Sequence, residues 1–304
     1  MTRPCKIGVQ LPEVERLVPW PELIAMAQAA ETVGFDSIWL GDHLLYDLPD
    51  GSVRGPWEVF TSLAALSAVT TRVQLGSLVA SLGFHEPAML AKMAATVDAI
   101  SGGRLILGVG AGWNEREYSA YGFPYDHRVD RFEEAFGLVR RLLAGETVTH
   151  AGTYYALDRC VIDPPAARPG GPLLMLGSNS PRMLSIGLPH VHQWNVWWSI
   201  YGNTPEGLAA VVADVRARTE ATGRDPDEVE ATACVYVQVP GGGGRTMGDP
   251  TMATTAPVKG SAREVADQLA SFAAVGVAHL QLVVDPITQR SIEWLGDVLS
   301  LLDA

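Results

Sequence analysis

The chain has 304 residues, of which 47% are hydrophobic and 18% charged, so it carries enough apolar material for a large buried core. Its formal net charge of -12 argues against a nucleic-acid-binding protein and against attraction to an anionic membrane surface. Three widely spaced cysteines exclude a disulfide framework, and no apolar signal segment opens the sequence. We therefore expect a soluble, cytoplasmic protein.

Short apolar runs alternate with segments of helical periodicity along the whole sequence. The expected strands are Cys5–Leu11, Ser37–Leu40, Val73–Ala80, Arg104–Val109, Leu173–Leu176, Val191–Val196, Glu230–Val239 and His279–Val284. The expected helices are Pro21–Val33, Val59–Val69, Pro87–Ile100 (with Lys92 and Asp98 on its solvent side), Arg128–Leu143, Pro181–Ile186, Pro205–Thr222, Ala262–Val275 and Ile292–Leu302.

Eight strands, each followed by a helix, predict parallel βαβ units, and strands that are apolar throughout fit a barrel buried on both faces. We predict one (β/α)8 TIM-barrel domain over residues 1–304, with an open doubly wound sheet as the alternative. Two connections are long enough to be insertions at the C-terminal rim, residues 145–172 and 240–260. The first contains a predicted hairpin around Gly152, and the second is either a lid or a loop without fixed structure.

Active sites of such barrels lie at the carboxyl ends of the strands, which selects candidate residues before any motif is considered. Asp42 and His43 directly follow the second strand. Histidine exchanges protons near neutral pH, and a neighbouring carboxylate can orient the ring or raise its pKa. We predict a functional pair, the alternative being a cap for the next segment. Motif alignment alone, through the family resemblance given below, adds Glu13 and Glu58 as further acid or base candidates.

Two segments rich in small residues follow strands four and five. Gly110, Ala111 and Gly112 let the backbone approach a ligand closely, although the spacing matches neither a dinucleotide fingerprint nor a P-loop. Gly177, Ser178 and Asn179 precede a helix that can begin at Pro181, which is typical either of a helix cap or of a phosphate site. We predict phosphate binding at the second segment, whereas the first alone indicates no particular ligand.

Aromatic residues are candidates for the wall of a substrate pocket. Trp194, Trp197 and Trp198 gather near strand six, where core packing explains them equally well. For a metal ion the sequence is poor, because His190 and His192 share a face without a supporting carboxylate or cysteine. We therefore expect no metal.

Several segments together resemble the luciferase-like flavin superfamily. They are IGVQLP, GFDSIWLGDHLL, VQLGSLVASLGFHEPAMLAKMAATVDAISGGRLILGVGAGW, RFEEAF and GVAHLQLVVDP. The chain is similar, over essentially its whole length, to the branch of oxidoreductases that use coenzyme F420, a deazaflavin.

The resemblance implies particular positions for the cofactor. A cis peptide bond between Leu78 and Val79 would lie behind the flavin ring, with Asp42 and His43 beside it. The phosphate-binding backbone would fall on Gly110–Gly112 and Gly177–Asn179. The substrate pocket would be lined from Glu13, Trp57, Phe84, Trp113, Trp197 and the 240–260 segment.

Some positions depart from the patterns of the superfamily. Trp113 stands where the sugar-phosphate dehydrogenases carry a glutamate, which disfavours glucose 6-phosphate as the substrate. Ala111 stands where bacterial luciferases carry an arginine for the phosphate of FMN. His85 and Glu86 stand where many members have an arginine, so one cationic contact to the cofactor is missing.

The leading hypothesis is hydride transfer between coenzyme F420 and a small, uncharged organic substrate, with His43 exchanging the substrate proton and Asp42 orienting it or contacting the ring. The first alternative is a monooxygenase that uses FMN in its reduced form. The second is an inactive flavin-binding barrel. The resemblance also implies a homodimer through helices two and three, where Leu63–Ala68 and Ala88–Ala95 are rich in small residues.

Overall fold

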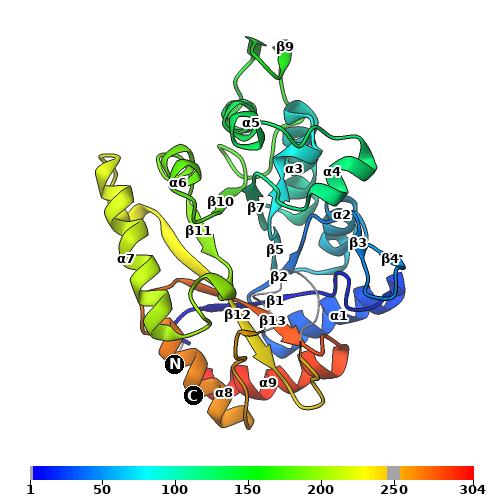
Figure 1. The fold of residues 1–304 in the computed structure, drawn as a ribbon, viewed down its shortest axis with the longest axis vertical. Helices are drawn as coiled ribbons and strands as arrows, with labels where there is room; N and C mark the ends of the chain where they lie inside the picture. Colours follow the sequence, from blue (N-terminus) through cyan, green and yellow to red (C-terminus); the bar gives the residue numbers. More distant parts are fainter. Residues whose placement is uncertain (1–2, 245–253) are drawn as a thin grey trace. The chain divides into compact units, whose positions relative to one another are not determined.

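The computed structural model describes residues 3–244 and 254–304 (Figure 1). Residues 245–253 of the 240–260 insertion therefore lie outside the described residues, and so does most of the segment for which a lid was predicted. Within the described part of the chain, no helix is both long and apolar enough to cross a membrane.

Parallel strands form the main sheet. They are β1 (Lys6–Gln10), β2 (Ser37–Leu40), β5 (Gln74–Ser77), β6 (Ala80–Ser81), β7 (Leu105–Gly110), β10 (Leu173–Gly177), β11 (Gln193–Val196), β12 (Glu230–Gln238) and β13 (His279–Asp285). Their order is β10-β11-β12-β13-β1-β2-β5-β7, and β7 pairs back to β10, which closes the order. With helices between its strands, the described chain is the predicted (β/α)8 barrel.

Helices follow the strands, mostly within one or two residues of the predicted bounds. They are α1 (Trp20–Val33), α2 (Val59–Val69), α3 (Pro87–Ser101), α4 (Glu115–Tyr121), α5 (Arg128–Leu143), α6 (Pro181–Gly187), α7 (Pro205–Ala221), α8 (Ala262–Ala273) and α9 (Gln289–Asp303). Short 3-10 turns are η1 (Leu82–Phe84), η2 (Trp198–Ile200) and η3 (Pro226–Glu228). Helix α4 was not predicted from the sequence.

Two small antiparallel pairs lie outside the main sheet. Strands β8 (Val148–Ala151) and β9 (Ala156–Cys160) form the hairpin predicted around Gly152. Strands β3 (Tyr46–Asp47) and β4 (Val53–Arg54) form a second pair, which the sequence did not indicate because each strand is only two residues long.

The chain divides into two compact units, described here separately. Unit 1 comprises residues 3–39 and 177–304, and unit 2 comprises residues 40–176. In unit 1, β1 pairs with both β13 and β2, while α9 packs against α1 and α8. In unit 2, α3 packs against α2 and α5. The expectation of a single domain over 1–304 remains a prediction.

A buried polar cluster lies in unit 1, where β13, β1 and β2 meet. The Nε1 of Trp39 donates to the Oγ of Ser37 at 2.7 Å, and that Oγ lies 2.7 Å from the Nε2 of His279. Burial, with a smaller effect of Lys6, lowers the pKa of His279 from 6.5 to about 3. The imidazole is therefore neutral, and its tautomer decides whether it donates to Ser37 or accepts from it.

In unit 2, the strand predicted over Val73–Ala80 is interrupted. The peptide bond between Leu78 and Val79 is cis, as the resemblance implies, and it separates β5 from β6. One expectation for this unit was wrong. Asp98 is fully buried rather than on the solvent side of α3, because its Oδ2 accepts the backbone N–H of Arg168 at 2.9 Å, in the 145–172 insertion.

Candidate active site

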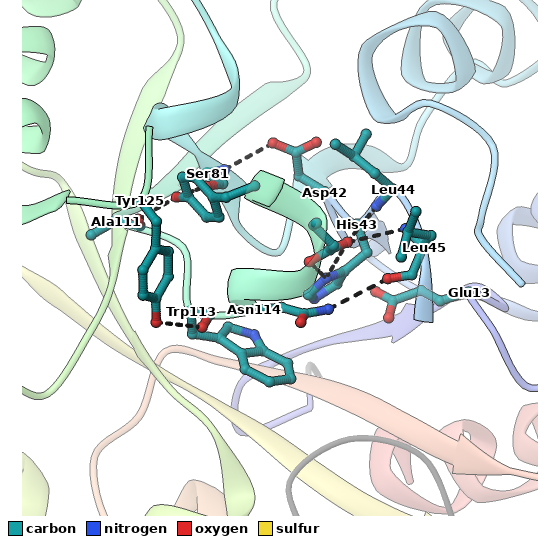
Figure 2. Close-up of polar contacts among 12 residues, drawn as sticks. Glu13, Asp42, His43, Leu44, Leu45, Ser81, Ala111, Trp113, Asn114 and Tyr125 are labelled. Carbon is teal, nitrogen blue, oxygen red and sulfur yellow. Dashed lines mark hydrogen bonds and ion pairs between the residues drawn. The ribbon is translucent and has the colours of Figure 1, made fainter. Parts of the chain in front are cut away.

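His43 lies just beyond the carboxyl end of β2, and a glutamate holds its ring. The Nδ1 of His43 lies 3.0 Å from the Oε2 of Glu117, a residue of α4. Figure 2 shows this contact among the dashed lines at His43. The side chain of His43 is 18% exposed, whereas that of Glu117 is 1% exposed. The pair therefore joins a buried carboxylate to an imidazole that solvent can reach.

The carboxylate of Glu117 is fixed by the backbone that follows His43. Its Oε1 accepts the N–H of Leu44 at 2.5 Å and the N–H of Leu45 at 3.2 Å. A carboxylate accepts hydrogen bonds only, so its contact with His43 places a proton on Nδ1. Nε2 is then the nitrogen that would exchange a proton with a substrate. The contact that orients His43 in this structure thus comes from Glu117, and a role of Asp42 beside the cofactor ring remains a prediction.

Asp42 instead connects the end of β2 to the end of β6. Its Oδ2 accepts the N–H of Ser81 and the Nε2–H of His85, each at 2.8 Å. Asp42 is 4% exposed, and the side chain of His85 is 12% exposed. The histidine that departs from the superfamily pattern therefore binds Asp42.

Two aromatic rings lie close to the imidazole of His43 within unit 2. The ring of Tyr46 lies 4.8 Å from that of His43, and the ring of Trp113 lies 5.8 Å away with an edge-on geometry. Trp113 is 50% exposed despite its size. A molecule that approached His43 here would meet apolar ring surfaces.

The segment that follows β7 is held by its carbonyl groups. Three successive carbonyls each accept a hydrogen bond from a side chain: Ala111 from Tyr118 at 2.7 Å, Gly112 from Arg128 at 2.6 Å and Trp113 from Tyr125 at 3.2 Å. Burial raises the pKa of Tyr118, which keeps its hydroxyl group protonated and able to donate. Figure 2 shows the bonds to Ala111 and Trp113.

These carbonyl contacts determine where the amides of the segment point. In a trans peptide unit, the C=O of one residue and the N–H of the next point in opposite directions. The N–H groups of Gly112, Trp113 and Asn114 are therefore directed away from the side chains that bind the carbonyls. Successive backbone N–H groups in such a loop are suited to an anion.

Glycine is required at position 112. Its φ of 72° lies in the left-handed region, and an added Cβ would come within 2.2 Å of the Tyr118 Oη and 2.3 Å of the Ser81 Oγ. The sequence predicted that a ligand approaches the backbone closely here. In the structure, the side chains of Tyr118 and Ser81 also approach Gly112 closely.

The cis bond lies beside the same strand ends. The N–H of Leu78 donates to the carbonyl of Leu40 at 2.8 Å. Only Gly41 separates Leu40 from Asp42 in the chain. Unit 2 therefore brings together the predicted residues Asp42, His43, Leu78 and Trp113.

The predicted residues of unit 1 are described by themselves. Gly177, Ser178 and Asn179 join β10 to α6, and Ser180 at the helix N-cap makes no side-chain cap bond. The carbonyl of Ser178 accepts the Nε1–H of Trp194 at 2.6 Å, which gives this buried tryptophan a structural role.

Four further candidates belong to the predicted set. Glu13 is 8% exposed and accepts a hydrogen bond from Gln10. The ring of Trp197 lies 3.9 Å from that of the buried Trp198. Trp57 in unit 2 is 50% exposed. Glu58, the second acid or base candidate, caps α2 by accepting the N–H groups of Phe60 and Thr61, so it has a structural role.

Glu117 is the main residue that sequence reasoning missed. It lies 74 residues from His43 in the chain, on a helix of seven residues. The available signal was Asn114 before the helix and Gly122 after it, which are residue types typical of the two ends of a helix. No group of three or more His, Cys, Asp or Glu residues suited to a metal ion occurs in the part of the chain that the structure describes.

Comparison with known families agrees with this geometry. Residues 6–240 match the luciferase-like monooxygenase family. The chain belongs to this family. A family relative, the phthiodiolone/phenolphthiodiolone dimycocerosates ketoreductase of Mycobacterium tuberculosis (strain H37Rv), is 30% identical over 239 residues. That match covers 72% of this chain and 61% of the ketoreductase, so the chain spans less than two thirds of that relative's length.

Two other similar proteins carry coenzyme F420 in their names. The F420-dependent glucose-6-phosphate dehydrogenase of Amycolatopsis mediterranei (strain U-32) is 37% identical over 149 residues, covering 47% of this chain and 44% of the dehydrogenase. The structure of an F420-dependent secondary alcohol dehydrogenase with an F420-acetone adduct matches all of both chains, with a TM-score of 0.82 and 20% identity. At that identity, the structural likeness establishes the fold alone.

Proposed function

We propose that this chain is an oxidoreductase that uses coenzyme F420 to exchange a hydride with a small, uncharged carbonyl compound or alcohol. The observation that carries the proposal is the contact between His43 and Glu117, which presents one imidazole nitrogen for proton exchange. Support for the cofactor comes from the relatives named for F420, the glucose-6-phosphate dehydrogenase above all.

The residues of unit 2 fit a phosphorylated flavin-type cofactor. The outward amides of Gly112, Trp113 and Asn114 are donors suited to a phosphate, and Asp42 and His43 would lie beside the ring. Phosphate binding by Gly177, Ser178 and Asn179 of unit 1 remains a separate prediction. When bound, the cofactor would supply or accept the hydride.

In this proposal His43 handles the proton of the reaction. A ketone that receives a hydride at its carbon must also receive a proton at its oxygen. Nε2 of a protonated His43 would donate that proton, and Nδ1 would keep its hydrogen bond to Glu117. In the reverse direction, neutral Nε2 would accept the proton of an alcohol.

The surroundings of His43 favour apolar substrates. The exposed ring of Trp113 stands where the sugar-phosphate dehydrogenases carry a glutamate, and the ring of Tyr46 lies beside both the imidazole and Trp113. Burying a charged or polyhydroxylated substrate against such rings would leave its polar groups without partners. We therefore infer a preference for ketones and secondary alcohols with apolar substituents.

Fluorescence-quenching titration of the purified protein with F420, FMN and reduced FMN tests the cofactor. We expect F420 to bind at least tenfold more tightly than either form of FMN. Tight binding of reduced FMN alone would contradict the proposal and favour an oxygen-dependent monooxygenase, which the family description makes the second candidate. Absence of binding by all three would favour the inactive barrel.

A further inference from the structure

We propose that Arg128 is a positioning residue for the anionic half of the cofactor, through its hold on the amide of Trp113. This inference rests on the proposed function. The ligand chemistry concerned is a phosphate ester, which F420 and FMN share. Arg128 would thereby supply the positive charge that is missing at Ala111 and before α3.

Arg128 is fixed on two sides. Its Nη1 donates to the carbonyl of Gly112 at 2.6 Å, and its guanidinium carbon lies 4.1 Å from the centre of the Tyr125 ring. The hydroxyl of Tyr125 in turn donates to the carbonyl of Trp113 at 3.2 Å. The guanidinium, the ring and the loop after β7 therefore form one connected arrangement.

The charge of Arg128 has no carboxylate partner among the residues that the structure describes. Its neighbour on the same helix, Arg131, is paired with Asp126 at 3.2 Å, and the nearby Asp130 is within 3.3 Å of the Nδ1 of His127. In a chain with a net charge of -12, an arginine bonded only to a carbonyl and a ring leaves a local positive charge. Such a charge is suited to an anion nearby.

The bond to Gly112 also acts on the amide that would meet the anion. The carbonyl of Gly112 and the N–H of Trp113 belong to the same peptide unit, so the guanidinium fixes the direction of that N–H. A cationic donor on the carbonyl also polarises the peptide unit, which makes the N–H a stronger donor. Arg128 therefore acts on the phosphate through the backbone.

The test compares F420 with its riboside fragment, which keeps the deazaflavin ring but lacks the phosphate and the side chain beyond it. For Arg128→Met we expect the Kd of F420 to rise roughly tenfold, as for the loss of one charge-assisted interaction, with the Kd of the riboside nearly unchanged. Arg128→Lys, which keeps a cation and a donor, should recover part of the affinity.

Arg131→Met is the matched control, because Arg131 lies on the same helix and also stacks on a ring, that of Tyr154 at 4.4 Å. It should bind both ligands as the unchanged protein does. Thermal melting by circular dichroism reports whether Arg128→Met remains folded.

The outcomes separate this inference from the proposed function. If Arg128→Met weakens the binding of F420 and of the riboside equally, or changes the binding of neither, the role of Arg128 is overturned while the F420 assignment stands. If the unchanged protein prefers FMN, the F420 assignment is overturned, and FMN against riboflavin then tests Arg128 in the same way. A protein that binds none of these ligands overturns both.

Discussion

His43 and His279 differ in the group that meets each imidazole. The buried carboxylate of Glu117 accepts from Nδ1 of His43, while the ring itself stays partly exposed. His279 is fully buried, and its Nε2 meets the hydroxyl of Ser37. The first environment suits the proton exchange proposed for His43, and the second keeps the imidazole of His279 neutral.

Replacing Glu117 by glutamine tests the positioning of His43. Glutamine keeps an acceptor for the N–H groups of Leu44 and Leu45, but its amide would donate to Nδ1 and move the proton to Nε2. We expect turnover of a ketone to fall by about 10²-fold or more, with little loss of stability. Nitrogen-15 spectra of the imidazole would report the change of tautomer.

The control for this substitution is Glu115→Gln, an exposed residue on the same short helix. It should leave both the tautomer and the turnover unchanged. An imidazole proton that stays on Nδ1 in Glu117→Gln would contradict the assignment.

The depressed pKa of His279 makes stability depend on pH. Because the unfolded histidine takes up a proton below about pH 6.5 and the buried one only near 3, protons favour the unfolded state between these values. The contribution is fully present above pH 6.5 and is lost as the pH falls, by about 1.4 kcal/mol per unit. Denaturant unfolding of His279→Gln from pH 7 to 4 should therefore show a shallower slope than that of the unchanged protein. Parallel slopes would contradict this account.

At the scale of elements, the sequence predicts those whose pattern is long and local. Helix α5 begins and ends at the predicted residues, because apolar positions repeat over sixteen residues. Helix α4 was missed because its seven residues, EREYSAY, carry too little periodicity. Strand 73–80 was predicted as continuous, since the cis bond at Leu78–Val79 was known only through the resemblance.

The residues of the candidate site also differ in whether a local sequence pattern predicts them. Asp42 and His43 could be predicted because they follow an apolar strand, and a strand end is visible in one segment of sequence. Their partners, Glu117 and His85, could not, because each contact joins segments more than forty residues apart. Arg128 was equally hidden, since its partner is a carbonyl group and not a side chain.

Glu134 of α5 holds the β8–β9 hairpin and offers a test at this scale. Its carboxylate accepts from His150 at 3.0 Å and from the backbone N–H groups of Thr153, Tyr154 and Tyr155. Burial alone raises its pKa, but these hydrogen bonds outweigh burial and hold the pKa below the ordinary 4.5. The stabilisation is therefore present above pH 4.5 and is lost as the pH falls through the lower, folded value.

For Glu134→Gln we expect a loss of about 1–3 kcal/mol, since glutamine cannot accept at both terminal atoms. Hydrogen exchange at Thr153–Tyr155 should accelerate, while amides of the central strands keep their protection. Glu133→Gln, an exposed neighbour, is the control and should leave the hairpin protected. Equal exchange in both variants would contradict this role.

At the scale of the whole molecule, the closed strand order was predictable from eight repeated units, whereas the oligomeric state was not. The small residues cited for a homodimer lie on α2 and α3, and these two helices pack against each other within the chain. On α3, Met89 is 57% exposed and Ile100 is 47% exposed, and their spacing of eleven residues puts them on one face. The homodimer remains a prediction, with this face as the candidate surface.

Light scattering after gel filtration tests the homodimer. We expect twice the chain mass of 32.5 kDa, and the single-chain mass when Met89→Lys is combined with Ile100→Glu, because charges would then be buried at the interface. Met93→Lys alone is a milder change on the same helix and should have an intermediate effect. A single-chain mass for the unchanged protein would contradict the prediction.

The pairing of β1 with β13 has a consequence for the connectivity of the chain. Arg3 binds Asp303 through two hydrogen bonds of 2.9 Å, so residues near the two ends of the sequence are held together, as Figure 1 also shows. A short linker could therefore join the two ends of the polypeptide without moving either of them. A circular permutant that joins these ends by a short linker and opens at the exposed turn of Gly223 should fold, with a melting temperature close to that of the unchanged protein. Its order of synthesis would differ, because β13 would then precede β1 on the ribosome.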